Sequence, residues 1–250
     1  MKFFSNKIVM SVWLMLITLG IFTLGLGIVD AGDPNGSATY SDSIGGLKYS
    51  INFTWTLVAA FLVFSMQAGF AFLGGFLKQK NMLGYLAHCL IDGTLGAIVF
   101  FLFGFALMFG GSKLCPGLDS GNVGWDGFFL CGDSYDVQTI MFWLFQMVFA
   151  TKTVSIIAGA VAARMKFVPY LVYSILMCGI IYPVYGHWVW GGGWLSTLPF
   201  LAGAKDFAGC ACVRTIGGIM ALMGAWIVGP RRDKYNPDGS PNAIPGHNMA

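Results

Sequence analysis

The sequence predicts an all-α protein that crosses a membrane several times, and three observations point to this fold class. The first is composition. Of the 250 residues, 56% are hydrophobic and 10% are charged, whereas soluble domains average roughly 25% charged residues. The mean hydropathy is +0.72. A soluble fold of this size would expose much of that apolar surface, so the composition favours a polytopic membrane protein.

Five long apolar segments are the second observation. They cover residues 50–77, 84–110, 138–163, 168–189 and 206–228. Each is long enough to cross a hydrocarbon layer of about 30 Å at ~1.5 Å per residue. In lipid such segments must be helices, because every backbone polar group needs an internal partner. We therefore expect a membrane domain over residues 50–230 with five core transmembrane helices.

The connecting loops are the third observation. Three short loops carry basic residues and belong in the cytoplasm by the positive-inside rule; these residues are Lys78, Lys80, Arg164, Lys166, Arg231, Arg232 and Lys234. The loop 111–137 holds one lysine and four aspartates, and we place it outside together with loop 190–205. The assignments alternate without conflict. They predict a multi-pass cell-membrane protein whose first core span starts outside and whose residues 231–250 form a cytoplasmic loop.

Residues 1–31 form a separate apolar segment that begins with two lysines, and we interpret it as an export signal. Its apolar run, residues 8–29, is longer than the ~7–15 residues of a usual signal core, so an uncleaved anchor is the alternative. In either case we expect residues 32–49 to form a linker outside the cytoplasm.

Several functions are excluded by what the sequence lacks. The net charge is only +3 and the basic residues are spread along the chain, so we expect no nucleic-acid partner. There is no Ser-His pair on neighbouring spans, no HExxH and no metal cluster, and we expect no enzyme, no catalytic residue, no metal and no cofactor. In the outer loop, Cys115 and Cys131 are expected to form a disulfide, with two free thiols as the alternative.

Aromatic residues near the outer ends of two spans are the candidate site residues. Phe142, Phe145 and Phe149 fall at i, i+3 and i+7 and so share a helix face. Such a stripe serves packing or lipid contact, or gates a pore. Trp190, in HWVWGGGW, is either an interfacial anchor or one wall of a cation–π site. Asp206 caps the fifth span, and the same carboxylate can raise local cation affinity.

These residues lie in motifs that resemble the ammonium transporter family. The motifs include FATKTVSIIAGAVAARMKF, HWVWGGGWL, DFAGCACVRTIGG, GPRRDKYNPDGS and IPGHN, and they occur in family order across about residues 50–250. The resemblance implies a homotrimer in the lipid bilayer with a pore through each subunit. It also implies an inverted pair of five-helix repeats, normally eleven helices, of which this chain carries the first repeat. We therefore expect the chain to be part of a longer protein.

The resemblance also implies roles for individual residues. Trp190 is similar to the external recruitment tryptophan, Phe149 with Phe145 to the outer gate, and Asp206 to the aspartate that supports recruitment. Ammonium or ammonia is the implied substrate. A small cation binds the faces of aromatic rings, and it crosses a lipid bilayer without its hydration shell only at a high free-energy cost. A cytoplasmic regulatory protein is a further implied partner.

Two cations depart from the family pattern. Arg214 stands where the family has the first of its two pore histidines, and arginine stays protonated and relays no proton. A fixed cation facing the pore repels ammonium by about 4 kcal/mol at ~4 Å and an effective dielectric of 20. The alternative is a snorkelling or paired arginine without a role. Lys152, three residues after Phe149, is a second unexpected cation near that face. The predicted function is ammonium transport, and the alternative is a non-conducting ammonium sensor.

Overall fold

The structure is a computed structural model, and it describes residues 33–40, 43–112, 119–199 and 203–248. The predicted signal or anchor at residues 1–31 lies outside the described residues. Within them the chain is helical, and its only extended pairings are two isolated bridges, Asp119 with Gly124 and Tyr235 with Pro241.

Among the residues that the structure describes, five helical segments are long and apolar enough to cross a membrane, which confirms the predicted fold class. The first is α2 (Ile44–Phe72), which continues into the 3-10 turn η1 (Leu73–Phe76). The second is α3 (Gln79–Val99), the π-helical turn η2 (Phe100–Gly104) and α4 (Phe105–Phe109). The third is α5 (Val137–Val161).

The fourth segment is also interrupted by a π-helical turn, and the fifth begins with one. The fourth is α6 (Phe167–Leu176), η5 (Met177–Ile181) and α7 (Tyr182–Val189). The fifth is η6 (Cys210–Thr215) followed by α8 (Ile216–Val228). Between α4 and α5 the loop contains the short 3-10 turns η3 (Phe128–Leu130) and η4 (Gly132–Ser134).

Capping side chains explain where the first and last spans begin. The hydroxyl of Ser43 accepts a hydrogen bond from the backbone N–H of Gly46 at 3.0 Å, so α2 starts at Ile44 and not at residue 50. The apolar pattern marks only the lipid-facing part of a helix, whereas a cap fixes its end. The fifth span starts at Cys210, after the left-handed Gly209, and the Asp206 carboxylate accepts hydrogen bonds from its first backbone N–H groups. The predicted linker therefore ends at Ser43.

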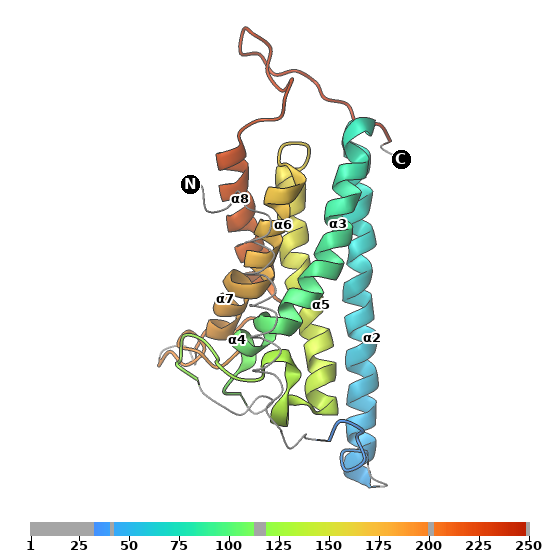
Figure 1. Ribbon diagram of the computed structural model, residues 1–250, viewed down its shortest axis with the longest axis vertical. Coiled ribbons are helices and arrows are strands. Elements are labelled where there is room, and N and C mark those ends of the chain that lie inside the picture. Colours follow the sequence, from blue (N-terminus) through green and yellow to red (C-terminus); the bar gives the residue numbers. More distant parts are fainter. Residues whose placement is uncertain (1–32, 41–42, 113–118, 200–202, 249–250) are drawn as a thin grey trace, which may run out of the picture.

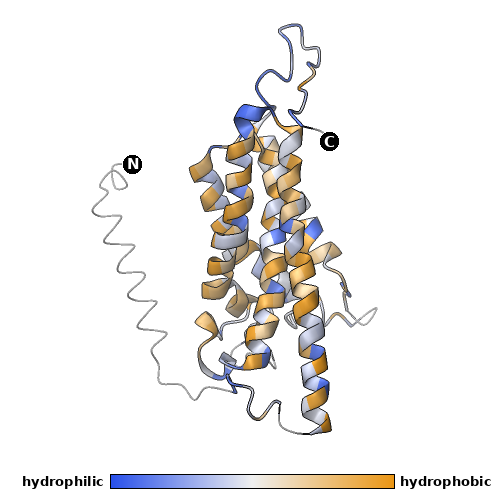
Figure 2. Cartoon of the chain, turned by 90° about the vertical axis from the view of Figure 1, so that its right-hand side faces the viewer, coloured by the Kyte–Doolittle hydropathy of each residue, from blue (hydrophilic) through white to orange (hydrophobic). Residues whose placement is uncertain are grey.

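Helix α5 lies at the centre of the bundle. It packs against α2 and α3 on one side and against α8 on the other (Figure 1). Glycine permits the closest approach: a Cβ on Gly217 of α8 would lie 3.0 Å from the carbonyl oxygen of Thr153 in α5. By contrast, α2 exposes large apolar side chains such as Trp55 and Phe61 along most of its length. The helices are apolar and the hydrophilic segments gather at their ends (Figure 2).

The loops sort to two ends, as the charge pattern predicts. The described parts of the α4–α5 loop and of the segment between α7 and η6 lie at one end, and the junctions α2–α3 and α5–α6 lie at the other with the segment after α8 (Figure 1). That second end therefore holds the seven basic loop residues. An ion pair of 3.4 Å between Lys78 and Asp233 joins two of these loops.

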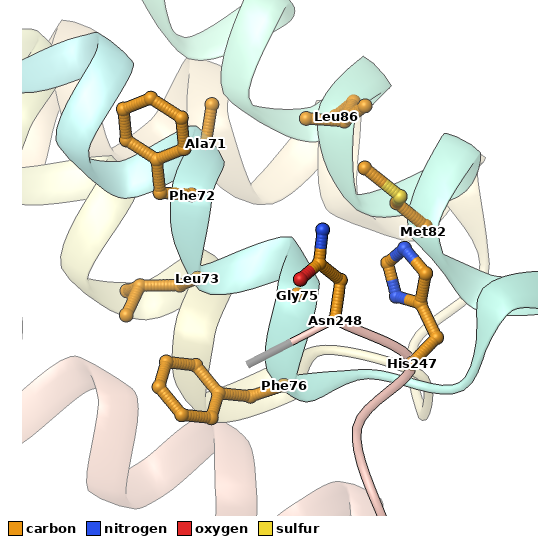
Figure 3. Close-up of a pocket in the computed structure, with 9 residues that line it drawn as sticks. All are labelled: Ala71, Phe72, Leu73, Gly75, Phe76, Met82, Leu86, His247 and Asn248. Atoms are coloured by element: carbon orange, nitrogen blue, oxygen red, sulfur yellow. The ribbon is translucent and has the colours of Figure 1, made fainter. Parts of the chain in front are cut away.

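The segment after α8 returns across this end to the α2–α3 junction. The backbone N–H of His247 donates to the carbonyl oxygen of Leu77 at 3.1 Å, and that of Asn248 to Gly75 at 3.3 Å. His247 and Asn248 line a cavity of about 460 Å³ together with Met82 and side chains from the end of α2 (Figure 3). The end of the described chain is thus held against the first helix pair.

Candidate functional site

An aromatic cavity of about 250 Å³ lies at the end of the bundle opposite the basic loops. We call it the aromatic cavity, and its lining residues are Phe109, Phe142, Phe145, Gln146, Phe149, Trp190 and Phe207. None of these side chains carries a charge. The predicted stripe of Phe142, Phe145 and Phe149 does share one face of α5, because all three line this cavity.

The predicted gate residues Phe145 and Phe149 and the predicted recruitment residue Trp190 form two ring contacts. The rings of Phe149 and Trp190 lie 6.2 Å apart at 72°, and those of Phe145 and Phe149 lie 5.1 Å apart at 74°. Both pairs are edge-to-face, the arrangement that ring quadrupoles favour. α5 and the end of α7 therefore bring the three residues together, as expected from their motifs.

Gln146 is a lining residue that the sequence reasoning missed. Its side chain is 6% exposed, and its Oε1 has no hydrogen-bond partner among the described residues. A buried amide oxygen without a donor costs about 1–3 kcal/mol. The signal was present in the sequence, because glutamine is the one polar residue in the run FWLFQMVFA and lies between Phe145 and Phe149. An open acceptor in an aromatic cavity suits a ligand that carries N–H groups.

Asp206 positions Trp190 without lining the cavity. The indole N–H of Trp190 donates to the backbone carbonyl oxygen of Asp206 at 2.6 Å. The Asp206 carboxylate accepts four backbone hydrogen bonds of 2.8–3.0 Å at the start of η6, from Gly209, Cys210, Ala211 and Cys212. Asp206 therefore satisfies the open amides at the start of the fifth span, as expected of a cap, although the N-cap position itself is occupied by Gly209. The segment that Asp206 orders fixes the ring of Trp190.

The ionisation of Asp206 follows from these contacts. Burial acts to raise the pKa of its carboxyl, but the hydrogen bonds from Cys212, Cys210 and Ala211 outweigh burial and lower the pKa below its usual value. The carboxylate is thus charged at neutral pH. Its negative charge lies beside the Trp190 ring without contacting the cavity.

The glycine run after Trp190 serves packing against the outer loop. A Cβ on Gly191 would collide with the carbonyl oxygen of Met108, and one on Gly193 would lie 2.8 Å from that of Gly121. A glycine from another segment approaches the tryptophan ring: a Cβ on Gly209 would lie 3.3 Å from Cη2 of Trp190.

His187 anchors the end of α7 that carries Trp190. The side chain is buried, with Nδ1 2.8 Å from the carbonyl oxygen of Met108 and Nε2 3.1 Å from Oδ1 of Asp119. Both ring nitrogens thus face oxygen acceptors. The contacts join α7 to α4 and to the outer loop, and so hold the tryptophan in place.

Arg214 lies in η6, on the same segment that begins beside Trp190. Its side chain is exposed in the described chain, and no ion pair with a described carboxylate involves it. The backbone N–H of Arg214 donates to the carbonyl oxygen of Gly209 at 3.2 Å. π-helical turns often occur at functional sites. That this side chain faces a pore stays a prediction.

Lys152 follows Phe149 by three residues on α5, but its side chain is not among those that line the aromatic cavity, so the expected second cation is absent from that lining. The Lys152 side chain is 2% exposed and turns towards α2 and α3, where its Nζ donates to Oε1 of Gln67 at 2.5 Å. It contacts Ser155 and Asp92 through this glutamine. We call these four residues the Lys152 cluster.

The predicted disulfide cannot be followed in the structure, because Cys115 lies outside the described residues. Its pairing with Cys131 stays a prediction. Cys131 lies at the end of η3, and its Sγ is 3.8 Å from the carbonyl oxygen of Phe129.

A comparison of the sequence with models of protein families gives a match over most of the chain. The model described as Ammonium Transporter Family matches residues 54–250. The chain belongs to the ammonium transporter family. This is a family of transporters, and the assignment confirms the resemblance inferred from the motifs. A similar relative is ammonium transporter Amt2 of Archaeoglobus fulgidus, 43% identical over 248 residues, which cover 96% of this chain and 50% of the relative.

Other members of the ammonium transporter family give the same match. A putative ammonium transporter of Synechocystis, sll1017, is 40% identical over 79% of this chain and 44% of its own length. Among solved structures, one named Sensor Amt Protein has a TM-score of 0.70 at 39% identity and covers 80% of this chain and 49% of that one. Mep2 of Saccharomyces cerevisiae has a TM-score of 0.63 at 27% identity, over 78% of this chain and 44% of its own. The chain thus spans about half the length of the relatives it matches.

Proposed function

We propose that the protein recruits ammonium at the aromatic cavity and transports ammonium or ammonia across a membrane. The carrying observation is the cavity itself, in which the edge-to-face pair Phe149 and Trp190 lies beside the unpartnered Oε1 of Gln146. A tryptophan face attracts a cation by about 0.5–2 kcal/mol, and an amide oxygen accepts its N–H. A relative whose match covers 96% of this chain is named an ammonium transporter.

The wall of the aromatic cavity carries no charged side chain, which suits the release of a bound ammonium ion into the pore as well as its binding. A carboxylate in the wall would hold a cation too tightly to release it, whereas neutral aromatic rings and one amide bind it weakly. The nearby Asp206 carboxylate supplies attraction from outside the cavity, because its oxygens are already occupied by backbone N–H groups. Phe145 and Phe149 then act as the constriction through which the ion loses its water.

We place the end with the basic loops in the cytoplasm of a multi-pass cell-membrane protein. The gathering of seven basic residues at one end and of aspartates in the opposite loop supports this orientation. We propose a homotrimer as the assembly, since α2 exposes a long apolar face that must meet lipid or protein. A regulatory protein would meet the cytoplasmic end, and residues 1–31 would direct export.

A second candidate function is ammonium sensing without sustained transport. Arg214 favours it, because an exposed guanidinium inside an apolar span opposes the passage of a second cation. The name of the neighbouring Sensor Amt Protein is consistent with such a role in that relative. Recruitment at the aromatic cavity is common to both candidates.

Transport is tested with the full-length gene product in proteoliposomes, by recording the current that follows an ammonium pulse. Transport predicts a sustained wild-type current that Trp190→Leu reduces and Arg214→His increases about tenfold or more. Trp188→Leu is the matched control, because Trp188 packs on Trp194 outside the cavity. Ammonium binding without any sustained current in the wild type would reject transport and favour the sensor.

A further inference from the structure

The Lys152 cluster holds a lysine ammonium group in the middle of the bundle, away from the aromatic cavity. Lys152 comes from α5, Gln67 from α2 and Asp92 from α3, so the three helices meet at this point. Lys152 is 2% exposed and Asp92 is fully buried, although the chain covers only about half of its relatives. The burial is therefore provided by these helices themselves.

A chain of hydrogen bonds joins the cation to the carboxylate. Lys152 donates to Oε1 of Gln67 at 2.5 Å, and Nε2 of Gln67 donates to Ser155 at 3.2 Å. The Ser155 hydroxyl lies 3.2 Å from Oδ2 of Asp92 and equally close to Oε1 of Gln67 and the carbonyl oxygen of Thr151. Tyr170 donates to Oδ1 of Asp92 at 2.6 Å. The contacts thus connect the cation to the anion through Gln67 and Ser155, and such networks strengthen their members.

The charges explain why the cluster persists in an apolar span. Asp92 is the one acidic residue in the five membrane-length segments. A buried carboxylate in the membrane is costly unless a cation or several donors balance it. Lys152 supplies that cation without a direct contact, because Gln67 and Ser155 lie between it and Asp92.

The groups around Nζ are those that recognise a free ammonium ion. Nζ lies 5.1 Å from the ring centre of Phe64, within the range of a cation–π contact. The Gln67 oxygen accepts one of its N–H groups, and the Asp92 carboxylate supplies the countercharge. A lysine side chain ends in the same tetrahedral nitrogen cation as ammonium, with a carbon in place of one hydrogen.

We propose that the Lys152 cluster is a binding site for an ammonium-sized cation and that the ammonium group of Lys152 is its permanent occupant. The tethered cation lies against the Phe64 ring and the Gln67 oxygen, and Asp92 is linked to it through Gln67 and Ser155. A permeating ion therefore finds no free carboxylate at this depth and is not trapped there. The site is separate from the aromatic cavity and goes beyond the proposed transport function.

Chemical rescue tests the site. The full-length protein is prepared with Trp190→Leu, so that binding at the aromatic cavity does not contribute, and Lys152→Ala then removes both the occupant and its stem. Thermal unfolding is measured at equal ionic strength in sodium chloride, ammonium chloride and methylammonium chloride. We expect Lys152→Ala to unfold at a lower temperature in sodium. Ammonium and methylammonium should each raise its midpoint by about 3 °C or more, because they bind only the folded state.

Two controls isolate the cluster. Lys152→Met keeps the stem and fills the space, so ammonium should give no specific shift. Lys152→Ala with Asp92→Asn removes the countercharge, so the shift should again be absent. If Lys152→Ala yields folded protein only when ammonium is present throughout purification, the proposal is supported. Equal midpoints in sodium and ammonium, rescue that survives Asp92→Asn, or no folded protein in either salt would overturn it.

Discussion

The aromatic cavity and the Lys152 cluster both include residues of α5 and are built from similar parts. Each combines aromatic rings with a glutamine oxygen: Phe149 and Gln146 in the cavity, Phe64 and Gln67 in the cluster. They differ in charge and in occupancy. The cavity contains no charged side chain and has an open acceptor, whereas the cluster contains a carboxylate and is filled by the chain's own ammonium group.

The difference shows how one helix presents the same ligand chemistry in two ways. A neutral aromatic site binds a cation weakly and lets it go. A site with a buried carboxylate would hold the cation, and here it is closed by a covalently attached one. Burial therefore decides the role of a cation in this fold: Lys152 is buried and balanced, while Arg214 is exposed without a described carboxylate partner.

The largest expected effect is on stability, and it comes from the buried charges of Asp92 and Lys152. Asp92→Leu leaves Lys152 without its countercharge and should lower the free energy of unfolding by about 3–5 kcal/mol. Thermal unfolding in detergent measures it. The matched double variant Asp92→Leu with Lys152→Met removes both charges and should recover most of the loss. A single variant as stable as the wild type would show that the charges are not coupled.

The next effect concerns the cavity wall. Trp190→Leu removes the ring that faces the recruited cation and should weaken ammonium binding about 2- to 30-fold, the range of a cation–π contact of about 0.5–2 kcal/mol. Isothermal titration calorimetry of the full-length protein measures the affinity. Trp188→Leu changes an equally large ring outside the cavity and should leave the affinity unchanged. Equal losses in the two variants would place recruitment elsewhere.

A smaller effect is expected at Gln146. Gln146→Leu keeps the volume but removes the open oxygen, and should weaken ammonium binding about 3- to 10-fold, as expected for one hydrogen bond in a cavity open to water. Tetramethylammonium has no N–H group, so its binding should not change. Gln138→Leu, nearer the start of α5, is the control. A loss of tetramethylammonium binding would indicate a packing defect.

The smallest effect follows from the pKa of Asp206, which lies below its usual value. A lowered pKa means that the carboxylate stabilises the fold fully above pH ~3.9, the usual value for an unfolded chain, and loses this contribution as pH falls further. Asp206→Asn should therefore cost about 1 kcal/mol at pH 7, as for a lost helix cap, and less at pH 3. Unfolding midpoints at both pH values measure the difference; a cost that grows on acidification would contradict this.

The sequence predicted the spans and most of the aromatic cavity, because both depend on patterns along one helix. Apolar runs located all five membrane-length segments, and the spacing of Phe142, Phe145 and Phe149 correctly placed them on one face. Helix starts were less predictable. The first span begins at Ile44 because Ser43 caps it, which hydropathy does not detect.

Contacts between helices were the part that spacing could not supply. Lys152 was expected near Phe149, but its side chain reaches α2 and α3, and its direction depends on the position of Gln67 and Asp92. Asp92 itself carried a usable signal, since a lone carboxylate in an apolar span requires a partner. Gln146 was overlooked because its neighbours dominated the pattern.

The most direct test of the account is where a heavy analogue of ammonium binds. Crystals of the full-length protein soaked in a thallium(I) salt would show the ion by anomalous scattering. We expect a peak against the Trp190 ring and none beside Asp92 in the wild type, with a second peak between Phe64 and Asp92 in Lys152→Ala. A wild-type peak beside Asp92, or no peak at Trp190, would contradict the assignment of an open cavity and a filled cluster.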